Sequence, residues 1–133
     1  MQHPDARPQI KWILKAQEKI KAGQKSLAID CYKQAIILQP ELFIPIFNIA
    51  VLLEKENMLE SARLWFNLAN EFESDSENVL FGISLVALKQ LRYKESLAGI
   101  NQLIQKIEAN GKKAQSVYYY VRALCYKELG QVN

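Results

Sequence analysis

Hydrophobic side chains recur along almost the whole chain at positions i, i+3, i+4 and i+7, a spacing typical of one face of an α-helix. Each stretch with this pattern ends at a glycine, asparagine, proline or a serine and aspartate cluster, all of which favour helix ends. The stretches cover residues 9–22, 25–38, 42–56, 59–73, 76–90, 93–108 and 114–129. No segment alternates with period two for long enough to predict a strand. The pattern predicts an all-α chain of seven helices.

A motif of small and aromatic residues repeats at a shift of 34 residues. Its three copies are Ala28, Tyr32, Ala35, Pro40; Ala62, Phe66, Ala69, Ser74; and the more divergent Ser96, Ile100, Leu103, Glu108. Upstream of each copy, and once more near the C-terminus, a large residue precedes a small one by four: Trp12/Ala16, Ile46/Ala50, Leu80/Ser84 and Tyr119/Ala123. Gly23, Asn57 and Leu91 occupy the turns. Small residues let neighbouring helices approach to about 8–10 Å, so we expect these alanines, with Trp12, Tyr32 and Phe66, to form the core.

This pattern resembles the tetratricopeptide-repeat (TPR) family, whose 34-residue helix–turn–helix unit carries W-xx-LG-xx-Y and then A-xxx-F and P. The resemblance extends from about Gln9 to the C-terminus and is strongest in the first two copies. Lys15 and Lys19 stand where the family usually has Leu and Tyr, and Ser74 and Glu108 replace the closing proline. The resemblance implies a right-handed α-solenoid of antiparallel helix pairs. An N-terminal tail (1–8) would precede a single domain (9–133), with repeats near 9–42, 43–76, 77–112 and a partial repeat at 116–133.

Composition excludes several classes of protein. Half of the 133 residues are hydrophobic and 23% are charged, which is incompatible with a chain disordered throughout. The net charge of +3 comes from scattered basic residues, which argues against nucleic acid as a partner. No apolar run reaches the ~20 residues that span a bilayer, and the polar segment 1–8 lacks the apolar region of a secretory signal. We therefore expect a cytoplasmic protein without a membrane partner.

Few residues in the sequence are candidates for catalysis or metal binding. Cys31 and Cys125 lie far apart in the sequence, and the only histidine is His3, so a four-ligand zinc site cannot be assembled. With His3 in the tail, a catalytic triad or Cys–His pair has no base. Phosphate-binding and metalloprotease motifs are absent from the sequence. We expect no catalytic residue, no metal and no cofactor, and hence a protein that is not an enzyme.

In TPR arrays the first helix of each pair lines a concave groove, and this resemblance assigns the groove residues here. They are Ile13, Gln17, Phe47, Asn48, Val51, Phe81, Leu85, Tyr120 and Leu124, with Lys21, Lys55, Lys89 and Lys127 at the rim. An apolar groove of this kind suits a peptide or an amphipathic helix of a partner protein. Two alternatives stay open: the groove residues pack on one another in a tight superhelix, or the rim lysines only compensate helix dipoles.

The chaperone-binding subset of the family clamps a C-terminal carboxylate with Lys and Asn. Asn48 matches one element of that clamp, but Ile13, Gln17, Asn78 and Gly82 stand where the others are expected, so a clamp is disfavoured. The alternative function is a structural segment of a larger TPR scaffold or multi-subunit complex. It would assemble, or self-associate, through the exposed C-terminal helix around Tyr119. RNA binding is disfavoured because Phe47, Phe81 and Leu85 do not read bases.

Overall fold

The computed structural model describes residues 7–74 and 76–130, and they form seven α-helices with no strand among them. This confirms the predicted all-α class, and each helix boundary falls within two residues of the sequence-based expectation. The described chain divides into two compact units, Met1–Phe72 and Glu73–Asn133. The predicted tail lies mostly outside the described residues, and Pro8 is already the first residue of a helix. The single domain over 9–133 and its repeat boundaries stay predictions.

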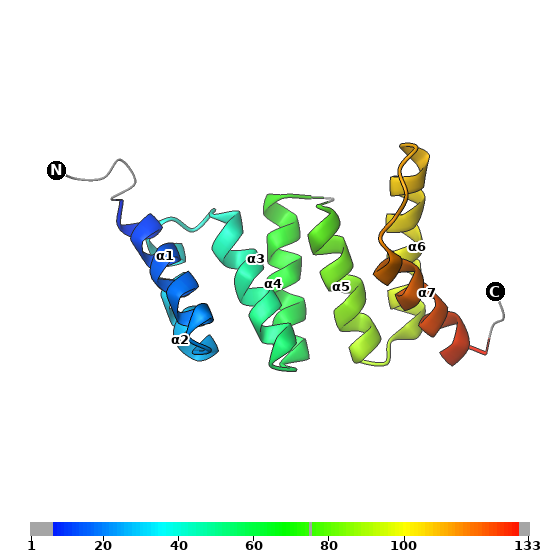
Figure 1. The fold of residues 1–133 in the computed structure, drawn as a ribbon, viewed down its shortest axis with the longest axis horizontal. Coiled ribbons are helices and arrows are strands. Elements are labelled where there is room, and N and C mark those ends of the chain that lie inside the picture. Colours follow the sequence, from blue (N-terminus) through cyan, green and yellow to red (C-terminus); the bar gives the residue numbers. More distant parts are fainter. Residues whose placement is uncertain (1–6, 75, 131–133) are drawn as a thin grey trace. The chain divides into compact units, whose positions relative to one another are not determined.

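The first unit consists of two antiparallel helix pairs (Figure 1). Its helices are α1 (Pro8–Lys21), α2 (Lys25–Leu38), α3 (Phe43–Lys55) and α4 (Leu59–Phe72). Helix α1 packs against α2, and α3 packs against both α2 and α4. The predicted small residues lie at these contacts without exposed surface: Ala16, Ala28, Ala35, Ala50, Ala62 and Ala69. Tyr32 and Phe66 are buried beside them, whereas Trp12 is only half-buried.

The second unit holds three helices, α5 (Glu77–Lys89), α6 (Tyr93–Ala109) and α7 (Ser116–Glu128). Helix α6 packs against α5 and α7, and α7 also contacts α5. Its core forms around Ile100, Leu103 and Ile104 of α6 and Tyr118, Val121 and Cys125 of α7. Helix α6 is the longest of the helices described, at 17 residues.

The turns within the three helix pairs share one backbone geometry. Gly23, Asn57 and Leu91 have φ angles of 76°, 61° and 64°, in the left-handed region. After each of them, the next N–H group bonds back to a carbonyl five residues earlier, as from Gln24 to Lys19. This is the Schellman arrangement that closes a helix and satisfies its last carbonyls. The repeated turn therefore sets the antiparallel return of each second helix, even where a leucine has to adopt it.

Candidate protein-interaction surfaces

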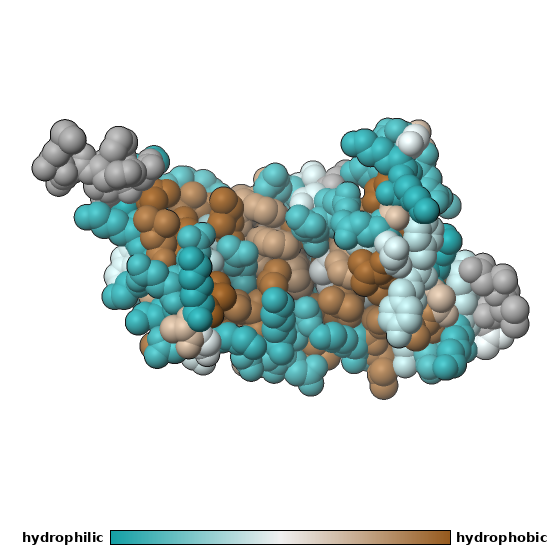
Figure 2. All heavy atoms as spheres, viewed as in Figure 1, coloured by the Kyte–Doolittle hydropathy of each residue, from teal (hydrophilic) through white to brown (hydrophobic). Residues whose placement is uncertain are grey.

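Two phenylalanines form an aromatic surface on α3 in the first unit. The rings of Phe43 and Phe47 stack with centroids 5.7 Å apart and planes 11° from parallel. Phe47 also meets the buried Phe66 edge-on at 5.9 Å, so its position is fixed by the core. Both rings stay partly exposed, as does Val51 one turn further along. Helix α3 thus presents a rigid apolar strip, visible as brown residues among polar ones over α3 in Figure 2.

Asn48, on the same helix, is held by a neighbouring helix. Its amide Nδ2 donates a hydrogen bond to the Tyr32 hydroxyl of α2 at 3.2 Å. Burial raises the pKa of Tyr32, and the hydrogen bond from Asn48 opposes part of that rise. The amide oxygen of Asn48 is left to accept a further hydrogen bond. Asn48 therefore has a structural role in joining α2 to α3, in addition to any contact with a ligand.

The predicted groove residues of α1 differ in exposure. Gln17 is exposed, whereas Ile13 is buried, with 9% of its surface accessible. The difference arises because α1 lies against α2, and Ile13, three residues before the fully buried Ala16, shares its face of the helix. Helix α1 consequently offers a polar side chain at the predicted surface, and the apolar part of the first unit's surface comes from α3.

In the second unit, Phe81 belongs to the core as much as to the surface. Its ring packs against the buried Tyr118 with centroids 4.8 Å apart, and it stays half-buried together with Leu85. On α7, Tyr120 is 63% exposed and Leu124, one turn later, is half-buried. The second unit therefore also carries exposed apolar side chains at the predicted positions, but Phe81 cannot be removed without loss of packing.

The predicted rim lysines all lie at the ends of helices. Lys21, Lys55 and Lys89 are the last residues of α1, α3 and α5, and Lys127 is next to last in α7. All four side chains are exposed. A cation at a helix C-terminus interacts favourably with the helix dipole. The four lysines therefore lie where they can stabilise the helix dipoles. Contact between these lysines and a partner is a separate proposal.

On α7, the pattern of a large residue followed four positions later by a small one has a different environment from that in the other repeats. Its small residue, Ala123, is exposed, whereas the equivalent Ala16, Ala50 and Ser84 are buried against the second helix of their pairs. Tyr119 and Tyr126, which flank Ala123, are partly exposed. Tyr119 donates a hydrogen bond to Glu108, and the Arg122 guanidinium lies 5.3 Å from the centre of its ring. No described helix covers this side of α7.

A polar cluster joins the start of α5 to the start of α7, and the sequence pattern gave no indication of it. The Tyr118 hydroxyl donates to Glu77 Oε2 at 2.7 Å, and Gln115 Nε2 donates to the same oxygen and to the Tyr118 hydroxyl. Burial, reinforced by Glu77, raises the pKa of Tyr118. Because Glu77 and Tyr118 lie 41 positions apart, only the three-dimensional structure shows that they meet.

Residues 7–74 and 76–130 contain neither a metal-binding cluster nor a membrane-spanning helix. No group of three or more His, Cys, Asp or Glu side chains there is arranged to hold a metal ion. None of the helices described is long and apolar enough to cross a membrane.

Comparisons with known proteins show which solved structures have a similar fold. No protein-family model matches the chain, and no curated protein is significantly similar in sequence. Solved TPR domains, in contrast, superpose over almost the whole chain. The Sgt2 TPR domain from Aspergillus fumigatus is 19% identical, with a TM-score of 0.76 over 92% of this chain and 79% of that one. The first TPR domain of Spaghetti (RPAP3), solved with the HSP90 peptide SRMEEVD, is 16% identical, with a TM-score of 0.81 over 97% and 98%.

A third solved structure, the TPR2B domain of yeast Sti1 in its pHsp70 complex, is 20% identical, with a TM-score of 0.74 over 94% of this chain and 98% of that one. Together with the helix pairs and the 34-residue repeat, these similarities define the architecture. The chain has the tetratricopeptide-repeat fold, as its sequence pattern predicts.

Proposed function

We propose that this chain is a non-enzymatic protein-interaction module that binds a peptide or amphipathic helix of a partner protein. The observation that carries the proposal is the stacked Phe43–Phe47 pair on α3, which stays partly exposed although it rests on the buried Phe66. Aromatic side chains in fixed positions typically contribute most of the energy at protein interfaces. Two of the similar folds were solved with peptide partners, the HSP90 peptide and pHsp70, which supports the same kind of ligand here.

The chemistry of the surface favours an apolar segment over a C-terminal carboxylate. The remaining positions of such a clamp hold Ile13, Gln17, Asn78 and Gly82, so the cations that it requires are missing. Asn48 uses one of its two amide N–H donors for the Tyr32 hydroxyl, which leaves one for a carboxylate. A carboxylate placed here would lose its hydration without gaining a cationic partner, which is unfavourable. Leucine, isoleucine or phenylalanine side chains would instead gain contact with Phe47 and Val51.

Each unit presents its own part of the proposed surface. The first unit contributes Gln17, Phe47, Asn48 and Val51, and the second contributes Phe81, Leu85, Tyr120 and Leu124. The rim lysines would attract acidic residues at the edge of the partner and so raise its association rate. We further propose that the protein acts in the cytoplasm, because Cys31 and Cys125 are free thiols, which persist in reducing compartments.

Site-specific photocrosslinking tests this function. A photoreactive phenylalanine analogue at Val51 or Leu85 should crosslink to the same partner protein in cells. The matched control carries the analogue at Leu64 of α4, which is 60% exposed but lies on the second helix of its pair. Crosslinks from both predicted positions and none from Leu64 are the expected result. Equal crosslinks from all three positions would show that the chain has no specific binding face.

A second candidate function, assembly through α7, is supported by the uncovered Ala123. In the other three pairs the same position is covered by a helix, and the flanking Tyr119 and Tyr126 supply apolar surface. The site would accept a helix from another subunit or from a second copy. Sedimentation analysis of the wild type and of Ala123→Glu tests self-association. If both variants are monomeric at high concentration, a second copy is ruled out as the occupant.

A further inference from the structure

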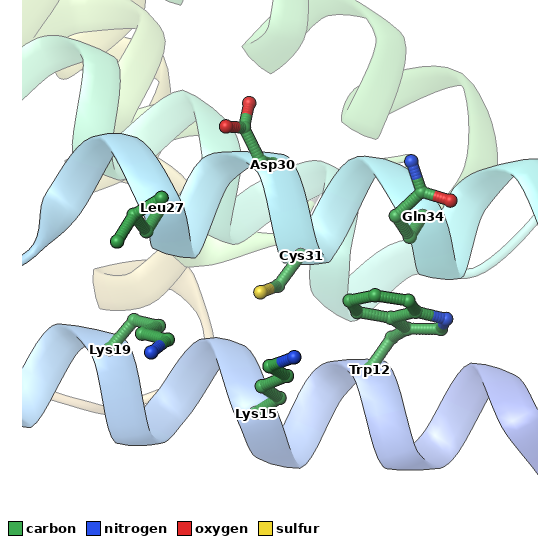
Figure 3. Close-up of a pocket in the computed structure, with 7 residues that line it drawn as sticks. All are labelled: Trp12, Lys15, Lys19, Leu27, Asp30, Cys31 and Gln34. Carbon is green, nitrogen blue, oxygen red and sulfur yellow. The ribbon is translucent and has the colours of Figure 1, made fainter.

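A cleft opens between α1 and α2 on the first unit, apart from the surface proposed above. It has a volume of about 420 Å³ and is lined by Trp12, Lys15 and Lys19 of α1 and Leu27, Asp30, Cys31 and Gln34 of α2 (Figure 3). A second hollow of about 370 Å³, lined by Pro8, Lys11, Trp12 and Lys15, adjoins it. The two share Trp12 and Lys15, so they form a trough along α1. None of the residues lining it belongs to the predicted groove.

The floor of the trough is apolar. Trp12 is half-buried, and in Figure 3 its indole reaches from α1 toward α2 beside Gln34. The sulfur of Cys31 points toward α1, and Leu27 lies on the same side of α2 with 45% of its surface exposed. These side chains present apolar surface to whatever enters the trough. An apolar floor on a helix pair suits another helix, which packs at a distance of about 8–10 Å.

The wall contributed by α1 is strongly cationic. Lys11, Lys15 and Lys19 follow one another at intervals of four residues, which places their side chains along one side of the helix. Like charges at this spacing repel, and the first turn of α1 contains no acidic residue to offset the dipole. The carboxylate of Asp30 points away from α1 in Figure 3. Among the residues that the structure describes, no carboxylate pairs with these three lysines.

The repeat supplies an internal comparison for Lys15 and Lys19. The residues that stand 34 positions later are Ile49 and Leu53, which are 0% and 7% exposed because α3 packs between α2 and α4. In α1 the same positions carry charge. An apolar repeat helix docked there would bury both lysines away from water, with only the Trp12 ring, 5.1 Å from the Lys15 Nζ, as a partner for Lys15. Burying charge in this way is costly. A helix with carboxylates opposite the lysines would avoid that cost and relieve the repulsion along α1.

We propose that this trough binds an acidic amphipathic helix of a partner protein. Apolar residues one turn apart in that helix would cover Trp12 and Leu27. Glutamate or aspartate side chains beside them would pair with Lys15, Lys19 and, further along, Lys11. Since most of these charges stay at the edge of the contact, they would set specificity and association rate, and binding would weaken with added salt.

The test uses Trp12 as its reporter. The chain contains two tryptophans, so Trp65→Phe leaves Trp12 as the only one. The probe is a synthetic helical peptide of about 18 residues, long enough to be helical in water, with leucine at i, i+3, i+4 and i+7 and glutamate elsewhere. The control peptide has lysine in place of glutamate. We expect the acidic peptide to shift the Trp12 emission and to bind more weakly as salt rises, and the basic peptide to do neither.

Charge-reversal variants locate the site. Lys15→Glu/Lys19→Glu should weaken the acidic peptide roughly tenfold or more, as expected for loss of close charge pairs. The matched control, Lys33→Glu/Lys94→Glu, makes the same change in net charge at two exposed lysines outside the trough and should bind as the parent does. Circular dichroism checks that every variant is folded, which matters most for Lys19 because its side chain is partly buried.

Four outcomes would overturn the proposal. Absence of binding would show that the lysines serve only to keep this face of the unit solvated. Equal weakening by both charge-reversal pairs would show attraction by net charge alone. Binding that survives Lys15→Glu/Lys19→Glu but is lost in Phe47→Ala would place the peptide on the α3 surface, which would support the proposed function and reject the trough. Anionic vesicles that bind where the acidic peptide does not would identify a lipid surface instead.

Discussion

The hydroxyl of Ser96 on α6 donates a hydrogen bond of 2.8 Å to the backbone carbonyl of Ser84 on α5. Both serines are buried, and they stand where the first two repeats have alanines. Gly99 of α6 also lies at this close contact between α5 and α6. A Cβ added there would lie 2.6 Å from Ser84 Oγ. The Oγ of Ser84 itself has no partner in the structure. The third repeat thus keeps the close helix contact of the others with serines in place of alanines, and with Gly99 where the first two repeats have Cys31 and Trp65.

Gly99 and Ser84 should therefore be energetically coupled. Gly→Ala in the interior of a helix ordinarily gains about 0.8–1 kcal/mol. In the wild type, Gly99→Ala must displace the Ser84 hydroxyl, so we expect the gain to shrink by about 1 kcal/mol or to reverse. In the Ser84→Ala background, where that hydroxyl is gone, the full gain should appear. Urea unfolding of the four proteins measures the coupling, and additive effects would show that α5 and α6 are further apart than described.

Leu91 is expected to be a strained turn residue. Its φ of 64° lies in the left-handed region, and its side chain is 68% exposed, so little packing compensates the strain. Left-handed geometry costs an ordinary residue about 1–2 kcal/mol, and glycine avoids this cost. Glycine also has more conformational entropy in the unfolded state, which offsets part of that gain. Leu91→Gly should raise the free energy of unfolding by about 0.5–1 kcal/mol.

The matched control for this substitution is Asn57→Gly at the equivalent turn of the second repeat, with φ of 61°. Asparagine tolerates the left-handed region better than leucine does, so its replacement should change stability less. Thermal or urea unfolding compares the two variants. A destabilised Leu91→Gly, or equal gains at both turns, would mean that the leucine is not strained.

Tyr118 should make stability depend on pH in the alkaline range. Burial and Glu77 raise its pKa above the ordinary value of about 10. Above that value the unfolded phenol loses its proton while the folded one keeps it, so the unfolded state binds fewer protons and stability falls as pH rises. Below pH about 10 the contribution is fully present. The urea midpoint should therefore fall as the pH rises above about 10, and keep falling until the folded phenol also loses its proton.

Other groups titrate in the same range, so the variant Tyr118→Phe isolates this contribution. It should be less stable at neutral pH, because the hydrogen bond to Glu77 is lost, and its midpoint should fall less at alkaline pH. Tyr120→Phe, at an exposed tyrosine of the same helix, should behave as the wild type. An unchanged pH dependence in Tyr118→Phe would contradict the raised pKa.

The sequence was sufficient to predict the helices and the small-residue contacts, because each follows from a short local pattern. Ala28 and Ala62, for example, are both fully buried as their position in the repeat requires. It was less informative about surfaces. Whether Ile13 is buried and Gln17 exposed depends on how α1 lies against α2, and the pairing of Glu77 with Tyr118 depends on the whole second unit. Such contacts join residues that no local pattern connects.

The trough beside Trp12 is a second surface that the sequence alone could not predict. Lys15 and Lys19 are visible in the sequence as departures from the family's pattern, yet only the structure shows that they border an apolar cleft with Leu27 and Cys31. The exposure of Ala123 likewise follows from the absence of a covering helix among the described residues, while its spacing from Tyr119 matches that of the buried alanines.

Exposed residues at helix ends should tolerate substitution without loss of stability. Lys55→Ala, at the end of α3, is expected to change the free energy of unfolding by less than about 0.5 kcal/mol. Ala62→Glu, in contrast, places a carboxylate in the α3–α4 contact and should cost several kcal/mol, roughly 3 or more, through overpacking and unpaired burial. Thermal unfolding compares the two. A stable Ala62→Glu would show that the register of the second repeat is wrong.

The most direct test of the central claim is the affinity of the crosslinked partner for Phe47→Ala, measured by isothermal titration calorimetry after circular dichroism confirms the fold. Truncation of a central aromatic side chain typically costs about 2 kcal/mol, so we predict a roughly thirtyfold weaker complex. Val51→Ser should weaken binding in the same direction, and Leu64→Ala, on α4, should leave it unchanged. Wild-type affinity in both Phe47→Ala and Val51→Ser would contradict binding on α3.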